Sequence, residues 1–287
     1  MHANRHTAFL VSQAPSPWFR SGANALRPIG VFDSGVGGLS VLKAIATRLP
    51  EQSLCYVADS AHAPYGDRTP AAILDRAEKL CEFLVRERQA KAIVVACNTA
   101  TAAAIKELRA RYEIPIIGME PAIKPAVRQT RGGVIGVMAT VQTLASERFR
   151  QLLQHHAGAA RILTQACPGL VEQVEAGDLD GPRTRDLVTR YTQALTRAGV
   201  DHIVLGCTHY PFLEPLIRET CGSEVGLLKT AQPVALQLQN RLMEFDLLHA
   251  PDSPNLETWT SGPLNHALLH RLWGSNLNIE TLPPIYR

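Results

Sequence analysis

Two cysteines occupy matching surroundings far apart in the chain. Cys97 ends the apolar run 92–97, AIVVAC, and Cys207 ends the run 202–207, HIVLGC; polar residues follow each of them. A cysteine at the end of a buried strand should lie near the amino end of the next helix, which lowers the pKa of its thiol. His209 can act as an acid, a base or a hydrogen-bond partner near neutral pH. Either cysteine alone could equally be a core residue, but the matched pair indicates reactive thiols.

The other four cysteines lie in core patterns or lack an activating neighbour. Cys55 lies inside a predicted strand and Cys81 on the apolar side of a predicted helix, while Cys167 precedes a proline and Cys221 precedes a glycine. The chain has no C-x-x-C pair and no Cys/His set with zinc-ligand spacing. We therefore expect free thiols and no metal site.

Two further polar segments follow predicted strands. The segment 32–42, FDSGVGGLSVL, contains Asp33 and Ser34 and then turns through glycines whose N–H groups could bind a carboxylate or a phosphate. The dinucleotide fingerprint requires a glycine where this chain has Ser40, so nucleotide binding is weakly supported. The segment 58–70, ADSAHAPYGDRTP, is predicted to be a loop because prolines and a glycine surround its tyrosine.

Two thiols without a cofactor fingerprint suit one class of reaction. Removing a proton from a carbon atom on one face and returning it on the other needs a base and an acid on opposite sides. Inversion at a stereocentre therefore fits better than disulfide chemistry, which usually uses cysteines two residues apart. A non-enzymatic thiol or metal-binding protein is the alternative from a different class.

These residues follow the strands of a predicted α/β fold. Apolar runs alternate with helical patterns, including a helix from about Leu39, another around 71–89 and a long one through the 140s and 150s. The runs have few polar interruptions, as expected for parallel strands buried on both faces. The predicted strands cover 28–33, 53–59, 92–96, 114–119, 133–140, 161–166 and 201–206.

The second half of this pattern repeats the first. IGVFDS at 29–34 aligns with IGVMAT at 135–140, and IVVACN at 93–98 aligns with IVLGCT at 203–208, at offsets of 106 and 110 residues. We expect two similar α/β domains with mostly parallel sheets, related by a pseudo-twofold, with the active site between them. Ligands of such sheets bind beyond the carboxyl ends of the strands. The residues there are Asp33, Ser34, Cys97, Asn98, Thr140, Cys207, Thr208 and His209.

Length and composition limit the partners. The chain has 287 residues, 46% of them hydrophobic and 19% charged, which suits two globular domains. Its 29 basic and 26 acidic residues give a net charge of +3 without a basic block, so we expect no nucleic acid. No apolar run approaches the roughly 18 residues that span a bilayer, and no secretory signal is recognisable, so we expect a cytoplasmic protein without a membrane partner. Residues 1–27 are predicted to be a loose extension.

The chain resembles the glutamate racemase family of the aspartate/glutamate racemase superfamily. The likeness runs from about Pro28 to about Ala235 through GVFDSGVGGLSVL, PYG, VVACNTAT, EPAIKPA, ATVQT, CPGLVEQVE and LGCTHYP. It implies cofactor-independent interconversion of L- and D-glutamate by two-thiol deprotonation and reprotonation, supplying D-glutamate for peptidoglycan. It also implies a first domain of 28–120 plus 230–287 and an inserted second domain of 121–229.

The resemblance assigns roles to individual residues. Cys97 and Cys207 are the implied catalytic thiols, assisted by Asp33 and His209. The implied substrate contacts, most of them small polar groups or backbone donors, are Asp33, Ser34, Pro64, Tyr65, Gly66, Asn98, Thr99, Thr140, Thr143, Glu175, Thr208 and His209.

Some alternatives stay open within the superfamily. Aspartate or hydantoin racemases, or a related isomerase, would use the same two thiols, and only the PYG, CNT and CTH combination favours glutamate. Some family members with N-terminal extensions are activated by a cell-wall precursor, so such an activator stays open for this chain, as does a homodimer.

Overall fold

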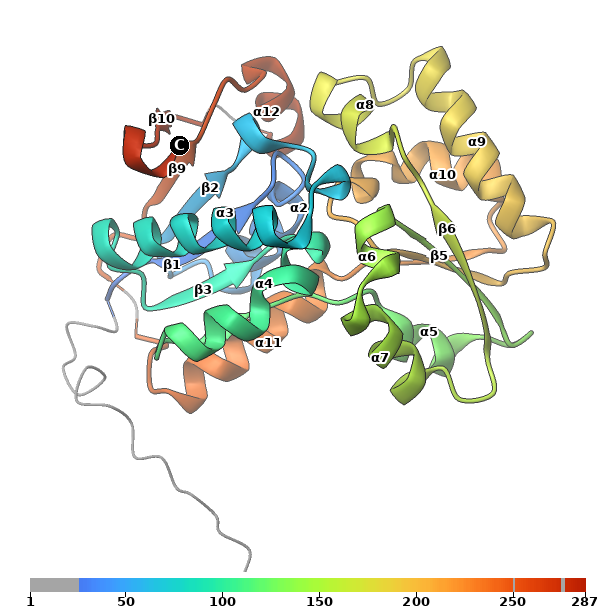
Figure 1. Ribbon diagram of the computed structural model, residues 1–287, viewed down its shortest axis with the longest axis horizontal. Coiled ribbons are helices and arrows are strands. Elements are labelled where there is room, and N and C mark those ends of the chain that lie inside the picture. The colour runs from blue at the N-terminus through green and yellow to red at the C-terminus, as the bar shows by residue number, and fades with distance from the viewer. Residues whose placement is uncertain (1–25, 250, 275–276) are drawn as a thin grey trace, which may run out of the picture.

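The computed structural model describes residues 26–249, 251–274 and 277–287. Most of the extension predicted at 1–27 lies outside these residues. The described chain forms two sheets of parallel strands, each covered by helices on both faces. In Figure 1 the first sheet occupies the left half of the molecule and the second sheet the right half. The expected α/β class with two similar halves is confirmed.

The first sheet has six strands in the order β10-β9-β2-β1-β3-β4. Its members come from both ends of the chain, because the last two strands add to the edge beyond β2 (Figure 1). The strands are β1 (Ile29–Asp33), β2 (Leu54–Ala58), β3 (Ala92–Val95), β4 (Ile116–Ile117), β9 (Leu256–Thr260) and β10 (Ile279–Thr281).

The second sheet has four strands in the order β6-β5-β7-β8. They are β5 (Val134–Ala139), β6 (Arg161–Ala166), β7 (His202–Leu205) and β8 (Gly226–Leu228). All four come from the middle of the chain.

The two sheets share one arrangement of four strands. The order β6-β5-β7-β8 matches β2-β1-β3-β4, and the register matches as well, because Gly30 pairs with Ile93 and Gly136 pairs with Ile203. These are the residues that the internal sequence alignment places together. The shared register supports a duplication, and it puts Cys97 and Cys207 at equivalent strand ends.

Helices cover both faces of each sheet. The first sheet packs against α3 (Pro70–Glu82) and α4 (Asn98–Arg111) on one face, and against α2 (Leu39–Arg48), α11 (Ala231–Glu244) and α12 (His266–Trp273) on the other. The second sheet packs against α5 (Ile123–Gln129) and α7 (Glu147–His156) on one face, and against α8 (Leu170–Ala176), α9 (Pro182–Thr196) and α10 (Glu214–Cys221) on the other.

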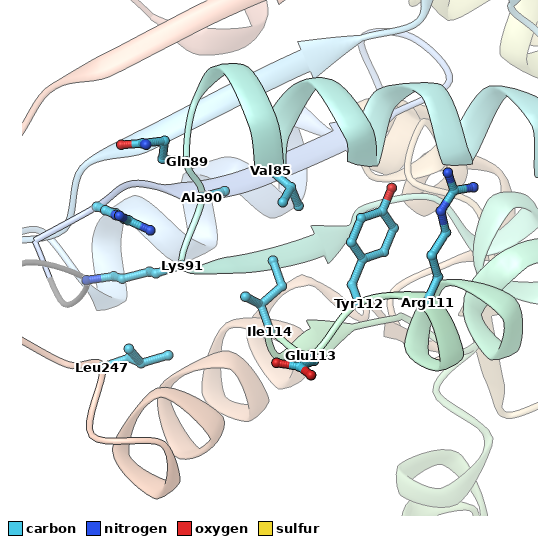
Figure 2. Close-up of a pocket in the computed structure, with 10 residues that line it drawn as sticks. Val85, Gln89, Ala90, Lys91, Arg111, Tyr112, Glu113, Ile114 and Leu247 are labelled. Atoms are coloured by element: carbon cyan, nitrogen blue, oxygen red, sulfur yellow. The ribbon is translucent and has the colours of Figure 1, made fainter. Parts of the chain in front are cut away.

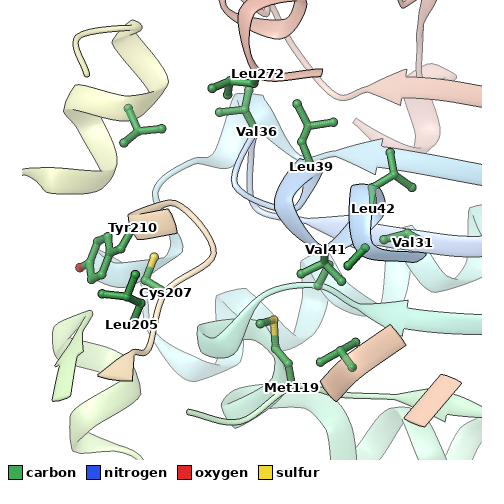
Figure 3. Close-up of a cluster of buried hydrophobic side chains, with 14 of the residues drawn as sticks. Val31, Val36, Leu39, Val41, Leu42, Met119, Leu205, Cys207, Tyr210 and Leu272 are labelled. Carbon is green, nitrogen blue, oxygen red and sulfur yellow. The ribbon is translucent and has the colours of Figure 1, made fainter. Parts of the chain in front are cut away.

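One buried cluster runs through both halves. It joins Val31 and Leu42 of the first half to Leu205 and Tyr210 of the second, as Figure 3 shows. Burying apolar area stabilises by roughly 25 cal/mol per Å², so a continuous core holds the two halves against each other. The cavity described below lies beside this cluster, since Cys207 belongs to both.

Two helices differ from the sequence expectation. The long helix predicted through the 140s and 150s is divided at Ser146 into α6 (Val141–Ala145) and α7, because the Ser146 side chain caps α7 by accepting the N–H of Phe149. The helix predicted around 71–89 continues beyond Glu82 as a π-helical turn over Phe83–Glu87.

Within the described ranges, no helix has the length and apolar character needed to cross a membrane.

Candidate active site

A small cavity lies beyond the carboxyl ends of β1, β3, β5 and β7. It is narrow, with a volume of about 10 Å³, which is room for about one water molecule. Its wall combines residues of both halves: Ser34, Pro64, Tyr65, Gly66, Cys97, Asn98, Thr99, Thr140, Val171, Cys207, Thr208 and His209. All of these except Val171 are predicted site residues. The remaining predicted residues, Asp33, Thr143 and Glu175, are hydrogen-bonded to residues of the wall.

Cys97 begins α4 on the first-half side of the cavity. Its Sγ atom caps the helix by accepting the N–H of Ala100 at 3.4 Å, and the thiol lies 3.9 Å from the hydroxyl of Ser34. The expectation of a lowered pKa is wrong for this residue. Burial of the thiol and the neighbouring Asp33 raise the pKa of Cys97 well above its ordinary value and outweigh the helix N–H.

Asp33 lies between the two halves at the end of β1. It is fully buried, and its carboxylate accepts hydrogen bonds from Ser34 of its own half at 3.3 Å and from Thr208 of the other half at 3.2 Å. Burial raises the pKa of Asp33, although the nearby His209 opposes that shift. A buried carboxyl group with a raised pKa can exchange a proton with the nearby thiol of Cys97.

On the opposite side, His209 joins Cys207 to Glu175. Its Nδ1 atom is 3.7 Å from the sulfur of Cys207, and its Nε2 atom is 2.6 Å from Glu175 Oε1. Burial alone would lower the pKa of His209, but the hydrogen bonds to Cys207 and Glu175 raise it well above the ordinary value. The imidazole is therefore held in its charged form beside the thiol.

The glycine turn after β1 does hold a carboxylate, but it is one of the protein's own. The backbone N–H of Val36 donates to Glu175 Oε1 at 2.8 Å. A Cβ atom on Gly35 would lie 1.9 Å from the same oxygen, and a Cβ on Gly37 would lie 2.4 Å from His209 Nδ1. A side chain at either position would force Glu175 or His209 to move, because the second half approaches the turn so closely.

Three threonine hydroxyls form a hydrogen-bonded triangle beside the cavity. The hydroxyl oxygen of Thr99 lies 3.0 Å from that of Thr140 and 3.2 Å from that of Thr143. The hydroxyl oxygens of Thr140 and Thr143 are 2.9 Å apart. Thr143 is not on the wall, so it orients the other two. Thr140 donates its proton to Thr143, so of the two hydroxyls on the wall that of Thr99 can donate to a ligand carboxylate.

Asn98 provides the strongest indication of a polar ligand. Its side chain lines the cavity and is 4% exposed, and neither its Oδ1 nor its Nδ2 has a hydrogen-bond partner within the described chain. Each such buried group costs about 1–3 kcal/mol when unsatisfied. A ligand carrying both donors and acceptors would satisfy both atoms.

Sequence reasoning missed two charged residues behind the cavity. Asp59 directly follows β2, just as Asp33 ends the neighbouring β1, and it forms a buried ion pair with Arg76 of α3. The position of Asp59 next to a strand end, like that of Asp33, could have indicated a role for it. Nothing in the helical pattern distinguished Arg76 from other arginines. Among the residues that the structure describes, no group of three His, Cys, Asp or Glu side chains could hold a metal ion.

The cavity has one thiol from each of two similar halves on its wall. Comparison with known proteins identifies the class of protein to which the chain belongs. A family model described as Asp/Glu/Hydantoin racemase matches residues 29–235. The chain belongs to this family, which makes it a racemase, an isomerase.

Similar curated proteins are glutamate racemases. That of Stutzerimonas stutzeri is 48% identical over 263 residues, covering 91% of this chain and 99% of the relative. That of Pseudomonas aeruginosa PAO1 is 50% identical over 257 residues, covering 88% and 97%.

The solved structures to which the chain is similar include glutamate racemases. Glutamate racemase isoform RacE1 of Bacillus anthracis has a TM-score of 0.80 at 32% identity, covering 91% of this chain and 99% of its own. The Escherichia coli glutamate racemase in complex with L-glutamate and the activator UDP-MurNAc-Ala has a TM-score of 0.79 at 28% identity, covering 89% and 98%.

Proposed function

We propose that this chain interconverts L- and D-glutamate by a two-thiol mechanism without a cofactor, and so supplies D-glutamate for peptidoglycan. One observation carries the proposal: Cys97 and Cys207 stand at equivalent strand ends of two similar sheets and line the same cavity. An enzyme that inverts a stereocentre needs a proton acceptor and a proton donor on opposite faces of the carbon, with the roles exchanged for the reverse direction.

Each thiol has its own proton partner. On one side Ser34 lies between Cys97 and Asp33, at 3.9 and 3.3 Å, and on the other His209 lies between Cys207 and Glu175. We assign the α-proton of D-glutamate to Cys97 and that of L-glutamate to Cys207. One thiolate takes the α-proton, the electron pair stays on the α-carbon, and the opposite thiol delivers a proton to the other face.

The substrate is recognised by the polar wall. We assign substrate contacts to the predicted wall residues, with Asn98 and the hydroxyls of Thr99, Thr140 and Thr208 as the side-chain partners of the carboxylates and the ammonium. Asp33 and His209 serve both the thiols and the substrate. Thr143 and Glu175 act by orienting wall residues, since their hydrogen bonds go to Thr140 and His209.

A circular-dichroism assay tests the function. L- and D-glutamate, aspartate and glutamine are each incubated with dialysed enzyme in chelator, with no cofactor added. We expect both glutamate enantiomers to lose their signal and the other amino acids to keep theirs. Racemisation of aspartate in preference to glutamate would move the chain to the aspartate alternative, and a rate that returns only with pyridoxal phosphate or a metal would refute the cofactor-free mechanism.

The domain boundaries are part of the proposal. We divide the chain into 28–120 plus 230–287 and an inserted 121–229, a division supported by the strands, since β1 to β4, β9 and β10 form one sheet and β5 to β8 the other. We also place the activity in the cytoplasm, which the six free cysteines support because thiols persist in reducing compartments.

We also propose activation by an anionic cell-wall precursor, by analogy with the Escherichia coli complex. A second cavity, of about 370 Å³, lies at the amino end of β3 (Figure 2). Its wall carries Arg27, Lys91 and Arg111, together with one acidic residue, Glu113. Racemisation rates with and without UDP-MurNAc-Ala test this, and equal rates would refute it. That the chain forms a homodimer stays a prediction, which sedimentation analysis would test.

A further inference from the structure

A buried ion pair supports the loop that carries Tyr65. Asp59 and Arg76 are 0% and 4% exposed. The guanidinium of Arg76 donates to both carboxylate oxygens, from Nε to Oδ2 at 3.0 Å and from Nη2 to Oδ1 at 2.8 Å. Arg76 lowers the pKa of Asp59 despite its burial. The carboxylate is therefore a charged, fixed acceptor, and neither residue lies on the wall of the cavity.

Tyr65 uses that acceptor. Its hydroxyl donates to Asp59 Oδ2 at 2.5 Å, and its side chain is 1% exposed. A phenol has one proton to donate, so the Tyr65 hydroxyl has no proton left for a substrate carboxylate. What Tyr65 contributes to the cavity depends on how the segment Pro64–Gly66 is held.

The ion pair is itself fixed from the opposite side. The Nη2 atom of Arg76 donates to the carbonyl of Tyr286 at 2.8 Å, and Nη1 donates to the backbone oxygen of Arg287 at 2.9 Å. The ring of Tyr286 packs on Phe83, with centroids 5.4 Å apart. Four N–H groups of the planar fork are thus used, which leaves the guanidinium little freedom to rotate.

We propose that Asp59 and Arg76 are positioning residues for substrate binding, acting through the Tyr65 hydroxyl to hold Pro64, Tyr65 and Gly66 against the cavity. The inference rests on the proposed glutamate racemisation and adds to it a chain of contacts that runs from the cavity wall to the backbone of Tyr286 and Arg287. The thiols and their proton partners are not members of this chain. Its loss should therefore weaken substrate binding more than it slows proton transfer.

The Tyr65→Phe variant is the direct test, because it deletes one hydroxyl and keeps the ring. We expect KM for D-glutamate to rise about tenfold with kcat within threefold of wild type, since misplacement of a binding element reduces productive contacts. Tyr286→Phe is the matched control. It removes another hydroxyl, bonded to Glu87 at 3.2 Å, and keeps the carbonyl that Arg76 uses, so its KM should match wild type.

A double-mutant cycle identifies the partner. As a single substitution, Asp59→Asn should raise KM. In the Tyr65→Phe background it should raise KM little further if the two residues act through one hydrogen bond. Arg76→Lys, which keeps the charge but not the fork, should lie between wild type and Arg76→Gln. Circular dichroism and melting establish that each variant is folded.

The outcomes separate this inference from the proposed function. A wild type that racemises glutamate beside a folded Tyr65→Phe with unchanged KM would overturn the positioning role and leave the function standing. A fall in kcat of Tyr65→Phe without a change in KM would also overturn it. A wild type inactive on glutamate would instead refute the function itself.

Discussion

Glu175 Oε1 lies 2.6 Å from His209 Nε2 and also accepts the backbone N–H of Val36 at 2.8 Å. One carboxylate oxygen therefore joins a residue of the second half to the glycine turn of the first. His209 is 1% exposed, so this bond is screened little by water. The Glu175 carboxylate thus supports both the charge of His209 and the contact between the halves.

Glu175→Gln should lower both turnover and the pKa of His209. The substitution keeps the shape of the side chain but removes the charge that helps raise this pKa. General acid–base partners contribute about 10²–10⁴-fold, and we expect a loss of kcat near the lower value. Titration of the His209 ring by NMR and steady-state racemisation measure the two effects.

Glu172→Gln on the same helix is the matched control, since Glu172 is exposed. It should leave both quantities unchanged. A Glu175→Gln enzyme with wild-type turnover in both directions would show that His209 needs no carboxylate.

Asp33→Asn should lower turnover and raise stability at neutral pH. Burial raises the pKa of Asp33, so the folded protein resists ionisation of this group while the unfolded chain does not. A group with a raised folded pKa contributes stability that is complete below the unfolded value, about 3.9, and is lost as the pH rises through the folded value. Asparagine is not subject to this loss.

Melting curves across pH measure the effect. The Asn variant should have the higher Tm at pH 7, and the difference should shrink as the pH falls toward 4. A variant less stable than wild type at every pH would mean that the hydrogen bonds from Ser34 and Thr208 to the carboxylate outweigh its burial cost.

Sequence reasoning reached the fold and the two thiols because both depend on local patterns. The strands β1, β3, β5 and β7 are nearly continuous apolar runs, and their repeat fixes which strand ends are equivalent. The family resemblance then supplied most of the cavity wall. Most of these residues lie within a few positions of a strand end. Strand ends can be recognised in the sequence, and ligands of parallel sheets bind beyond them.

The contacts behind the wall could not be predicted, because each one joins distant segments. Glu175 meets Val36 across 139 positions, and Arg76 meets Tyr286 across 210. The pKa of Cys97 was predicted in the wrong direction for a similar reason. A helix N-terminus is visible in sequence, whereas the burial of the thiol and the approach of Asp33 are not.

Gly37→Ala should destabilise the protein and reduce activity together. The added Cβ would lie 2.4 Å from His209 Nδ1, so either the turn or the imidazole must move. We expect a loss of about 1–3 kcal/mol in urea unfolding, as for other overpacked sites, and a lower kcat. Gly132→Ala is the control, because its Cβ would have only Asp201 at 3.5 Å nearby. Equal stability of the two variants would argue against the close approach.

Each thiol should serve one enantiomer of the substrate. Replacing either Cys97 or Cys207 by serine leaves a far weaker acid and base on that face, so racemisation should collapse in both directions. Elimination from a glutamate analogue with a good β-leaving group requires only removal of the α-proton, and one remaining thiolate can do this while the leaving group departs with its electron pair. The two reactions therefore separate the two faces.

Cys97→Ser should still eliminate from the L-analogue through Cys207, and Cys207→Ser should still eliminate from the D-analogue through Cys97. Each variant is assayed against both enantiomers for release of the leaving group. Cys221→Ser is the control, because Cys221 lies at the end of α10 and outside the cavity wall, and it should retain racemisation and both eliminations. If each of the two cavity variants processed both enantiomers equally, a single thiol would reach both faces of the α-carbon, and the assignment of one thiol to each face would have to be abandoned.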